Sequence, residues 1–159
     1  MSAIKYHGLK IFSCLILLLI FISCNPKESS SANGDPNGII SISYSEIGGP
    51  LGNYSMVKVT QDSIYAEQGV TRNRTHKEWK SAISLQTWKR LTSNIDVKTL
   101  DRIKSSPSQQ SVDGIDETFQ IRTPKKYHAY VNAFVDTAHY GQLKKLKDQI
   151  RALLPTEYN

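Results

Sequence analysis

Cysteine is nearly absent from this chain. Its 159 residues contain only Cys14 and Cys24, and both lie near the start of the sequence. The sequence after Cys24 therefore offers no disulfide framework and no set of thiolates for a metal site. A folded region downstream must gain its stability from the packing of its side chains.

Recognisable catalytic motifs are lacking as well. The sequence has no Gly-x-Ser-x-Gly, no His-Glu-x-x-His and no phosphate-binding loop signature. The histidines His76, His128 and His139 do not have the spacing of metal ligands. We therefore predict a non-enzymatic protein without a metal or a cofactor, in which these histidines are structural.

One catalytic alternative stays open. The densest acidic group, residues 113–117, is expected to be a turn that leads into a strand. An enzyme would need carboxylates and histidines from distant segments to converge, for example Asp113, Asp116, His128 and His139. Their meeting in one cleft is the observation that would favour an enzyme.

The apolar run near the start of the chain is too short for a typical transmembrane helix. This run, Ile11–Ile22, has about twelve residues, whereas a helix that spans a bilayer needs about 20. Lys5 and Lys10 precede it. A basic start followed by a short apolar core is typical of a signal peptide, which we expect to cover residues 1–23.

The end of this segment predicts a lipid anchor. Phe21-Ile22-Ser23-Cys24 resembles the bacterial lipobox, in which an apolar residue and a small residue precede a cysteine at the cut; Phe21 stands where Leu is usual. The resemblance implies that Cys24 becomes the N-terminus and carries acyl chains such as palmitate. Several buried chains, at about 0.8 kcal/mol per CH₂, hold a protein firmly at a membrane.

Residues 24–38 are expected to be a flexible tether, because they lack apolar side chains large enough to order them. Asn25 follows the cysteine, and it is not the Asp that resembles an inner-membrane retention signal. We therefore predict an exported protein anchored to the outer membrane rather than the inner one. Its folded domain would lie in the periplasm or at the cell surface.

Charge of one sign is not concentrated anywhere in the chain. The formal net charge of +6 falls to +4 once Lys5 and Lys10 leave with the signal peptide, and the remaining basic residues are scattered. Nucleic-acid binding favours a dense basic face. The charge pattern instead indicates a soluble surface near anionic lipid or polysaccharide.

Residues 39–159 are expected to form a single α+β domain: an antiparallel sheet of about five strands with two to three helices packed on one face. Alternation of apolar and polar residues predicts the strands. The clearest alternation lies in residues 40–44, 54–60, 64–68, 117–123 and 127–134, with a further short strand around 76–82.

Helices are predicted by capping residues and by apolar residues at helical spacing. Ser84 is expected to cap a first helix and Asp96 a second, shorter one. Residues 143–154 carry apolar residues at helical spacing and should form a C-terminal helix. On that helix, we expect Lys147 and Arg151 to belong to the solvated face.

A glycine-rich loop between the first two strands is the candidate binding site. It comprises Ile47, Gly48, Gly49, Pro50, Leu51 and Gly52. Glycines relax the limits on the backbone, and a Gly-Gly-Pro bend can project one apolar side chain, such as Leu51 or Ile47. The alternative is an ordinary wide hairpin loop without a ligand.

The segment Ser45–Gly52, together with the order of strands and helices, is similar to the emfourin-like (protealysin inhibitor) family. Gly48, Gly49 and Gly52 match the family's early segment, whereas Pro50 replaces an aromatic residue and the serine is displaced. The resemblance implies inhibition of a thermolysin-like metalloprotease. The strand around residues 76–82 and the lipid tether depart from the family. The chain also resembles small lipoproteins of Gram-negative bacteria.

These patterns together predict a membrane-anchored lipoprotein with a non-enzymatic binding domain. Its specific form would be a protease inhibitor that acts through residues 47–52. The alternative is a structural or assembly lipoprotein that binds another component of the cell envelope.

Overall fold

The computed structural model of the chain describes residues 38–158. The expected signal peptide, the predicted lipidation site Cys24 and nearly all of the tether lie outside these residues. Within residues 38–158, no helix is long and apolar enough to cross a membrane.

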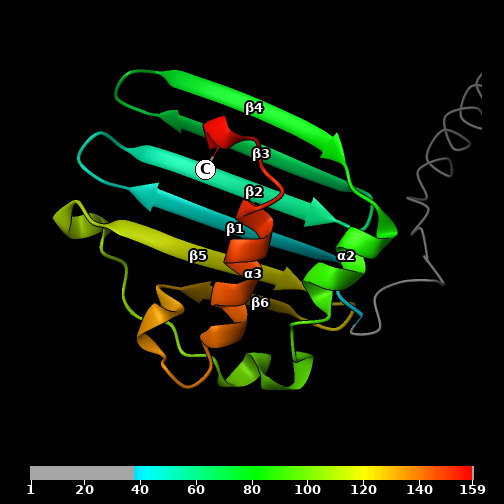
Figure 1. Ribbon diagram of the computed structural model, residues 1–159. Helices are drawn as coiled ribbons and strands as arrows, with labels where there is room; N and C mark the ends of the chain where they lie inside the picture. The colour runs from blue at the N-terminus through cyan, green and yellow to red at the C-terminus, as the bar shows by residue number, and fades with distance from the viewer. Residues whose placement is uncertain (1–37, 159) are drawn as a thin grey trace, which may run out of the picture. The chain divides into compact units, whose positions relative to one another are not determined.

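A six-stranded antiparallel sheet forms the centre of the fold (Figure 1). The strands are β1 (Ser41–Gly48), β2 (Asn53–Thr60), β3 (Ser63–Val70), β4 (Thr75–Ala82), β5 (Ile115–Arg122) and β6 (Tyr127–Val131). Their spatial order is β4-β3-β2-β1-β5-β6, so β1 is central and β4 and β6 are the edges. The predicted α+β class is confirmed, but the sheet has six strands rather than about five.

Strand β4 accounts for the difference between the six strands observed and the five or so predicted. The sequence indicates only a short strand around residues 76–82, whereas eight residues of β4 pair with β3. Trp79 is its one large apolar residue that packs against the core, and its ring lies 6.3 Å from that of Tyr158. An edge strand is held by backbone pairing on one side, so its sequence needs little alternation.

Residues 38–158 contain two α-helices and four short 3₁₀ helices. They are α2 (Leu85–Thr92), η1 (Val97–Arg102), η2 (Gln110–Val112), η3 (Ala133–Val135), α3 (Gly141–Arg151) and η4 (Thr156–Tyr158). Both predicted caps are confirmed: Ser84 Oγ accepts from Thr87 N at 3.1 Å, and Asp96 Oδ1 accepts from Lys98 N at 3.0 Å. The helix that follows Asp96 is a 3₁₀ helix.

Strand β6 ends earlier than the alternation of residues 127–134 suggests. Its last paired residue is Val131. Asn132 then adopts a left-handed backbone conformation, with φ of 48°, and starts η3. Asparagine tolerates this conformation better than most residues, so the strand ends there.

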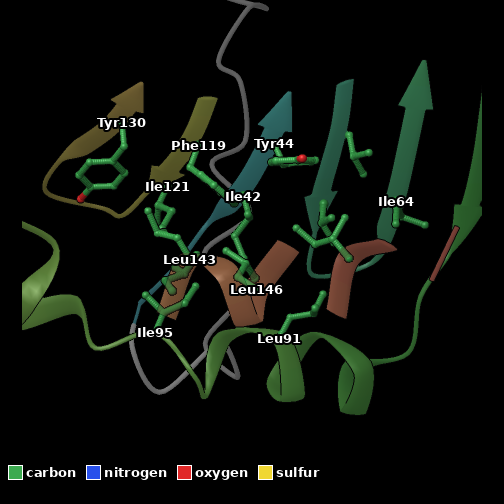
Figure 2. Close-up of a cluster of buried hydrophobic side chains, with 14 of the residues drawn as sticks. Ile42, Tyr44, Ile64, Leu91, Ile95, Phe119, Ile121, Tyr130, Leu143 and Leu146 are labelled. Atoms are coloured by element: carbon green, nitrogen blue, oxygen red, sulfur yellow. The ribbon is translucent and has the colours of Figure 1, made fainter. Parts of the chain in front are cut away.

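The core lies between one face of the sheet and the helices, as Figure 2 shows. Alternate residues of β1 and β5 point toward the helices, because successive side chains of a strand face opposite sides. The labelled side chains with at most 2% exposure are Ile42, Tyr44, Ile64, Leu91, Ile95, Phe119, Ile121, Leu143 and Leu146. Burial of each large apolar side chain contributes about 1.5–3 kcal/mol.

The other face of the sheet carries mostly polar side chains. Residues that alternate with the core positions include Ser43, Ser45, Lys58, Tyr65, Glu67, His76, Glu78, Thr118 and Gln120. We call this side the open face. The contrast between the two faces explains why helices α2 and α3 pack on one side of the sheet (Figure 1).

Candidate functional site

The 47–52 loop forms the tip of the β1–β2 hairpin, and several of its side chains are exposed. Ile47 is 39% exposed and Leu51 is 41% exposed, and Pro50 also faces solvent. Ile115 at the start of β5 pairs with Gly48, and η2, which contains Val112, is bonded to Ile47 O through Gln110; both Ile115 and Val112 are more exposed still. We call these five residues the tip patch.

The glycines of the loop are required by its backbone. Gly48, Gly49 and Gly52 have φ values of 143°, 78° and 66°, which side chains of L-residues disfavour. A Cβ on Gly48 would lie 2.1 Å from the carbonyl oxygen of Gly114. The conformation of the loop and its close approach to residue 114 therefore both depend on glycine.

Backbone hydrogen bonds tie the loop to the neighbouring turns on both sides. Gly49 N donates to Gly114 O at 3.1 Å. On the other side, Thr71 N donates to Gly52 O at 2.9 Å, and Arg72 N donates to Leu51 O at 3.2 Å. The backbone of the loop is thus packed into the domain, while its apolar side chains stay exposed.

An ionic network on the helix-covered face supports the same strand end. Glu46, immediately before Ile47, lies 2.7 Å from Arg151 Nη2 and 3.2 Å from Lys147 Nζ. Lys147 also contacts Glu117 at 2.5 Å, and its side chain is only 18% exposed. The prediction that Lys147 belongs to the solvated face is therefore wrong, because two carboxylates of the sheet draw it inward.

Burial and hydrogen bonding shift the ionisation of this network. Burial raises the pKa of Glu46, but a hydrogen bond with Tyr44 and the charges of Lys147 and Arg151 outweigh it, so the pKa is lowered overall. Burial, reinforced by its hydrogen bond with Glu46, raises the pKa of Tyr44. Glu46 therefore stays ionised and holds the end of β1 against α3.

Asp116 has a structural role that explains its burial. Its carboxylate accepts hydrogen bonds from Ser108 Oγ at 2.5 Å, Gln109 N at 2.8 Å and Asn132 Nδ2 at 2.7 Å. Burial raises the pKa of Asp116, but these hydrogen bonds outweigh it and the pKa is lowered. The carboxylate fastens the loop before β5 to the sheet, and the neighbouring Asp113 is exposed in the turn.

The two histidines of the catalytic alternative have partners of their own. His128 is 7% exposed and lies 3.2 Å from Asp101; burial lowers its pKa. His139 Nδ1 lies 3.2 Å from Asp136. Among residues 38–158, hydrogen bonds and ion pairs join neither histidine to Asp113 or Asp116.

Comparisons with known proteins add no family to this description. No family model matches the chain. No curated protein sequence matches it either. The resemblance to the emfourin-like family therefore stays a prediction that rests on Ser45–Gly52 and the order of the elements.

The first prediction concerns the close approach of Gly48 to Gly114. Gly48→Ala is expected to lower the free energy of unfolding by about 3 kcal/mol, because the new Cβ meets a carbonyl oxygen and the backbone angle is strained. Gly141→Ala is the matched control, since nothing lies within 4 Å of the added atom; its effect should stay under about 1 kcal/mol. Urea unfolding measures both, and equal stabilities would contradict the described packing.

The second prediction concerns the stability of the protein at low pH. The pKa of Glu46 is lower in the folded protein than its ordinary value of 4.5. The ionised carboxylate therefore stabilises the fold fully above pH 4.5, and this stabilisation is lost as the pH falls through the folded pKa. Glu46→Gln should cost about 1 kcal/mol at pH 7, after screening by solvent, and the difference from the unmodified protein should shrink below about pH 4.

Urea midpoints measured between pH 7 and pH 3 check this expectation. The exposed Glu157 provides the control, and Glu157→Gln should leave the pH profile unchanged. A Glu46→Gln deficit that persists undiminished at pH 3 would show that the charge of Glu46 is not the source of the stabilisation.

Proposed function

We propose that this protein is an exported lipoprotein, anchored through acyl chains on Cys24, whose domain binds a protein partner through the 47–52 loop. The observation that carries the proposal is the exposure of Leu51 on a loop with a fixed backbone. Loops held by a rigid scaffold often form binding sites. A preorganised loop also loses little conformational freedom when it binds.

Inhibition of a thermolysin-like metalloprotease is the specific form of the proposal. It is supported by the glycine pattern of Ser45–Gly52, which resembles the emfourin-like family. Pro50 and Leu51 are exposed in the turn that connects β1 with β2, and Figure 1 shows this turn at one end of the sheet. An exposed apolar hairpin turn of this kind suits insertion into the cleft of a larger protein.

A structural or assembly role in the cell envelope is the second candidate. The observation that favours it is the extent of the tip patch, which continues beyond the loop to Val112 and Ile115. Contiguous exposed apolar groups mark contacts with other proteins, among other kinds of site. A broad envelope partner would cover the whole patch, whereas a protease cleft would enclose the loop alone.

The third prediction tests inhibition. The soluble domain with its tether, freed of the signal peptide and carrying Cys24→Ser, is expected to inhibit a thermolysin-like protease at micromolar concentration. Leu51→Asp should weaken inhibition at least tenfold, because a buried contact of a leucine is worth about 2 kcal/mol. Leu85→Asp is the matched control: Leu85 is 40% exposed but lies in α2, so inhibition should not change.

Crosslinking in intact cells separates the two candidates. A photoreactive residue at position 51 should trap a protease if the inhibitor proposal holds, and an envelope component if the assembly proposal holds. A residue at position 85 should trap neither. If Leu51→Asp inhibits the protease as well as the unmodified domain, the loop is not the inhibitory element.

The fourth prediction tests the anchor. Cys24→Ala is expected to abolish acylation and release the protein from the membrane fraction, because Cys24 is the predicted attachment site. Cys14→Ala removes the other cysteine but keeps the lipobox, so acylation should persist. Mass spectrometry of the N-terminus and cell fractionation measure both effects. An unacylated, uncleaved N-terminus, or membrane-bound Cys24→Ala protein, would contradict the lipoprotein proposal.

A further inference from the structure

Three side chains of metal-ligand type gather on the open face of the sheet. Glu67 on β3 and His76 and Glu78 on β4 each offer one ligand atom, and these atoms lie within 4.8 Å of one another. Glu67 is paired directly with Glu78, and His76 precedes Glu78 by two residues on the same face. We call these three residues the Glu-His-Glu cluster.

The two carboxylates of the cluster are an unfavourable pair without a cation. Like charges directly opposite on neighbouring strands destabilise a sheet. Tyr65 Oη donates to Glu67 at 2.9 Å, and the imidazole lies 2.7 Å from Glu78. Lys58 and Lys80 flank Tyr65 on the same face, yet in the part of the chain that the structure describes no lysine or arginine forms an ion pair with either carboxylate.

The neighbouring strand orients the imidazole. Tyr54, Gly69 and His76 lie side by side across β2, β3 and β4. A Cβ on Gly69 would lie 2.5 Å from Tyr54 Oη, so the glycine lets the tyrosine cross β3 and reach His76 Nδ1 at 2.7 Å. Nε2 is then directed toward Glu78. A partner on the second ring nitrogen is a common feature of histidine metal ligands.

A hollow of about 320 Å³ lies beside the imidazole. Tyr54, Gly69 and His76 contribute to its lining, whereas Glu67 and Glu78 do not. A tetrahedral zinc ion holds its ligand atoms about 3.4 Å apart. His76 Nε2 and Glu78 Oε1, which lie 2.7 Å apart, would have to separate to reach that spacing, and the exposure of both side chains permits it.

We infer that the Glu-His-Glu cluster is a binding site for a divalent transition-metal ion of the zinc type. One imidazole with two carboxylates suits such an ion better than Mg²⁺ or Ca²⁺, which favour oxygen ligands alone. Three protein ligands leave a fourth position for water or another ligand. The ion would join the edge strand β4 to β3 and neutralise the repulsion between Glu67 and Glu78.

The fifth prediction tests this site in the full-length protein, purified in detergent and freed of metal with EDTA. Titration with zinc chloride in a calorimeter should show one ion bound per chain, and titration with magnesium chloride should show no binding. Zinc at a hundredfold excess over its dissociation constant should raise the Tm by about 5 °C or more, because it binds the folded state.

Substitutions assign the ion to the cluster. His76→Gln and Glu67→Gln should each weaken zinc binding at least tenfold. Tyr54→Phe, which removes the hydroxyl that positions the imidazole, should weaken it by about tenfold. His139→Gln is the matched control, since His139 pairs with Asp136 instead, and it should bind zinc normally.

Two results would overturn the inference. One is the absence of binding at millimolar zinc in the unmodified protein. The other is a zinc affinity that His76→Gln and Glu67→Gln leave unchanged, or that His139→Gln abolishes. Circular dichroism of each variant shows whether the sheet is intact, and two ligand variants keep the test decisive if one of them fails to fold. Neither result depends on whether the 47–52 loop inhibits a protease.

Discussion

The pairing of β1 with β2 on one side and β5 on the other is the constraint on which the rest of the structure depends. In this register Tyr44 lies beside Val57 and Phe119, and all three face the helices. A slip of one residue would turn every core side chain of β1 to the open face. The same register places Glu46 where α3 can reach it and leaves Ile47 at the tip, so the core and the candidate site arise together.

Features governed by local rules could be predicted from the sequence. Ser84 and Asp96 cap helical segments because their side chains bond to backbone groups only two or three residues away. The alternation of polar and apolar residues likewise identifies β1 and β5. The 47–52 loop could also be recognised, because its glycines separate the alternating patterns of two strands. The closeness of Gly114, which makes Gly48 necessary, depends on a residue far along the chain and leaves no local signal.

Contacts between distant segments could not be predicted in this way. Lys147 and Glu46 are separated by 101 positions, and the helical pattern of α3 shows only which stripe is apolar. It does not show that a residue at the border of that stripe lies above two acids of the sheet. The Glu-His-Glu cluster could not be predicted from the sequence either. Its three residues come from two strands, and they are recognised as neighbours only when the β3–β4 register is known.

The turn between β3 and β4 connects the proposed metal site with the 47–52 loop. Thr71 and Arg72, which follow β3, donate the hydrogen bonds that hold Gly52 and Leu51. An ion that joins Glu67 to β4 would restrict the motion of these strands against each other, and thereby the turn that they carry. The loop that carries Leu51 would then lose less conformational entropy when it binds a partner. Metal would thus act on partner binding through the order of the scaffold, without any contact between the ion and the partner.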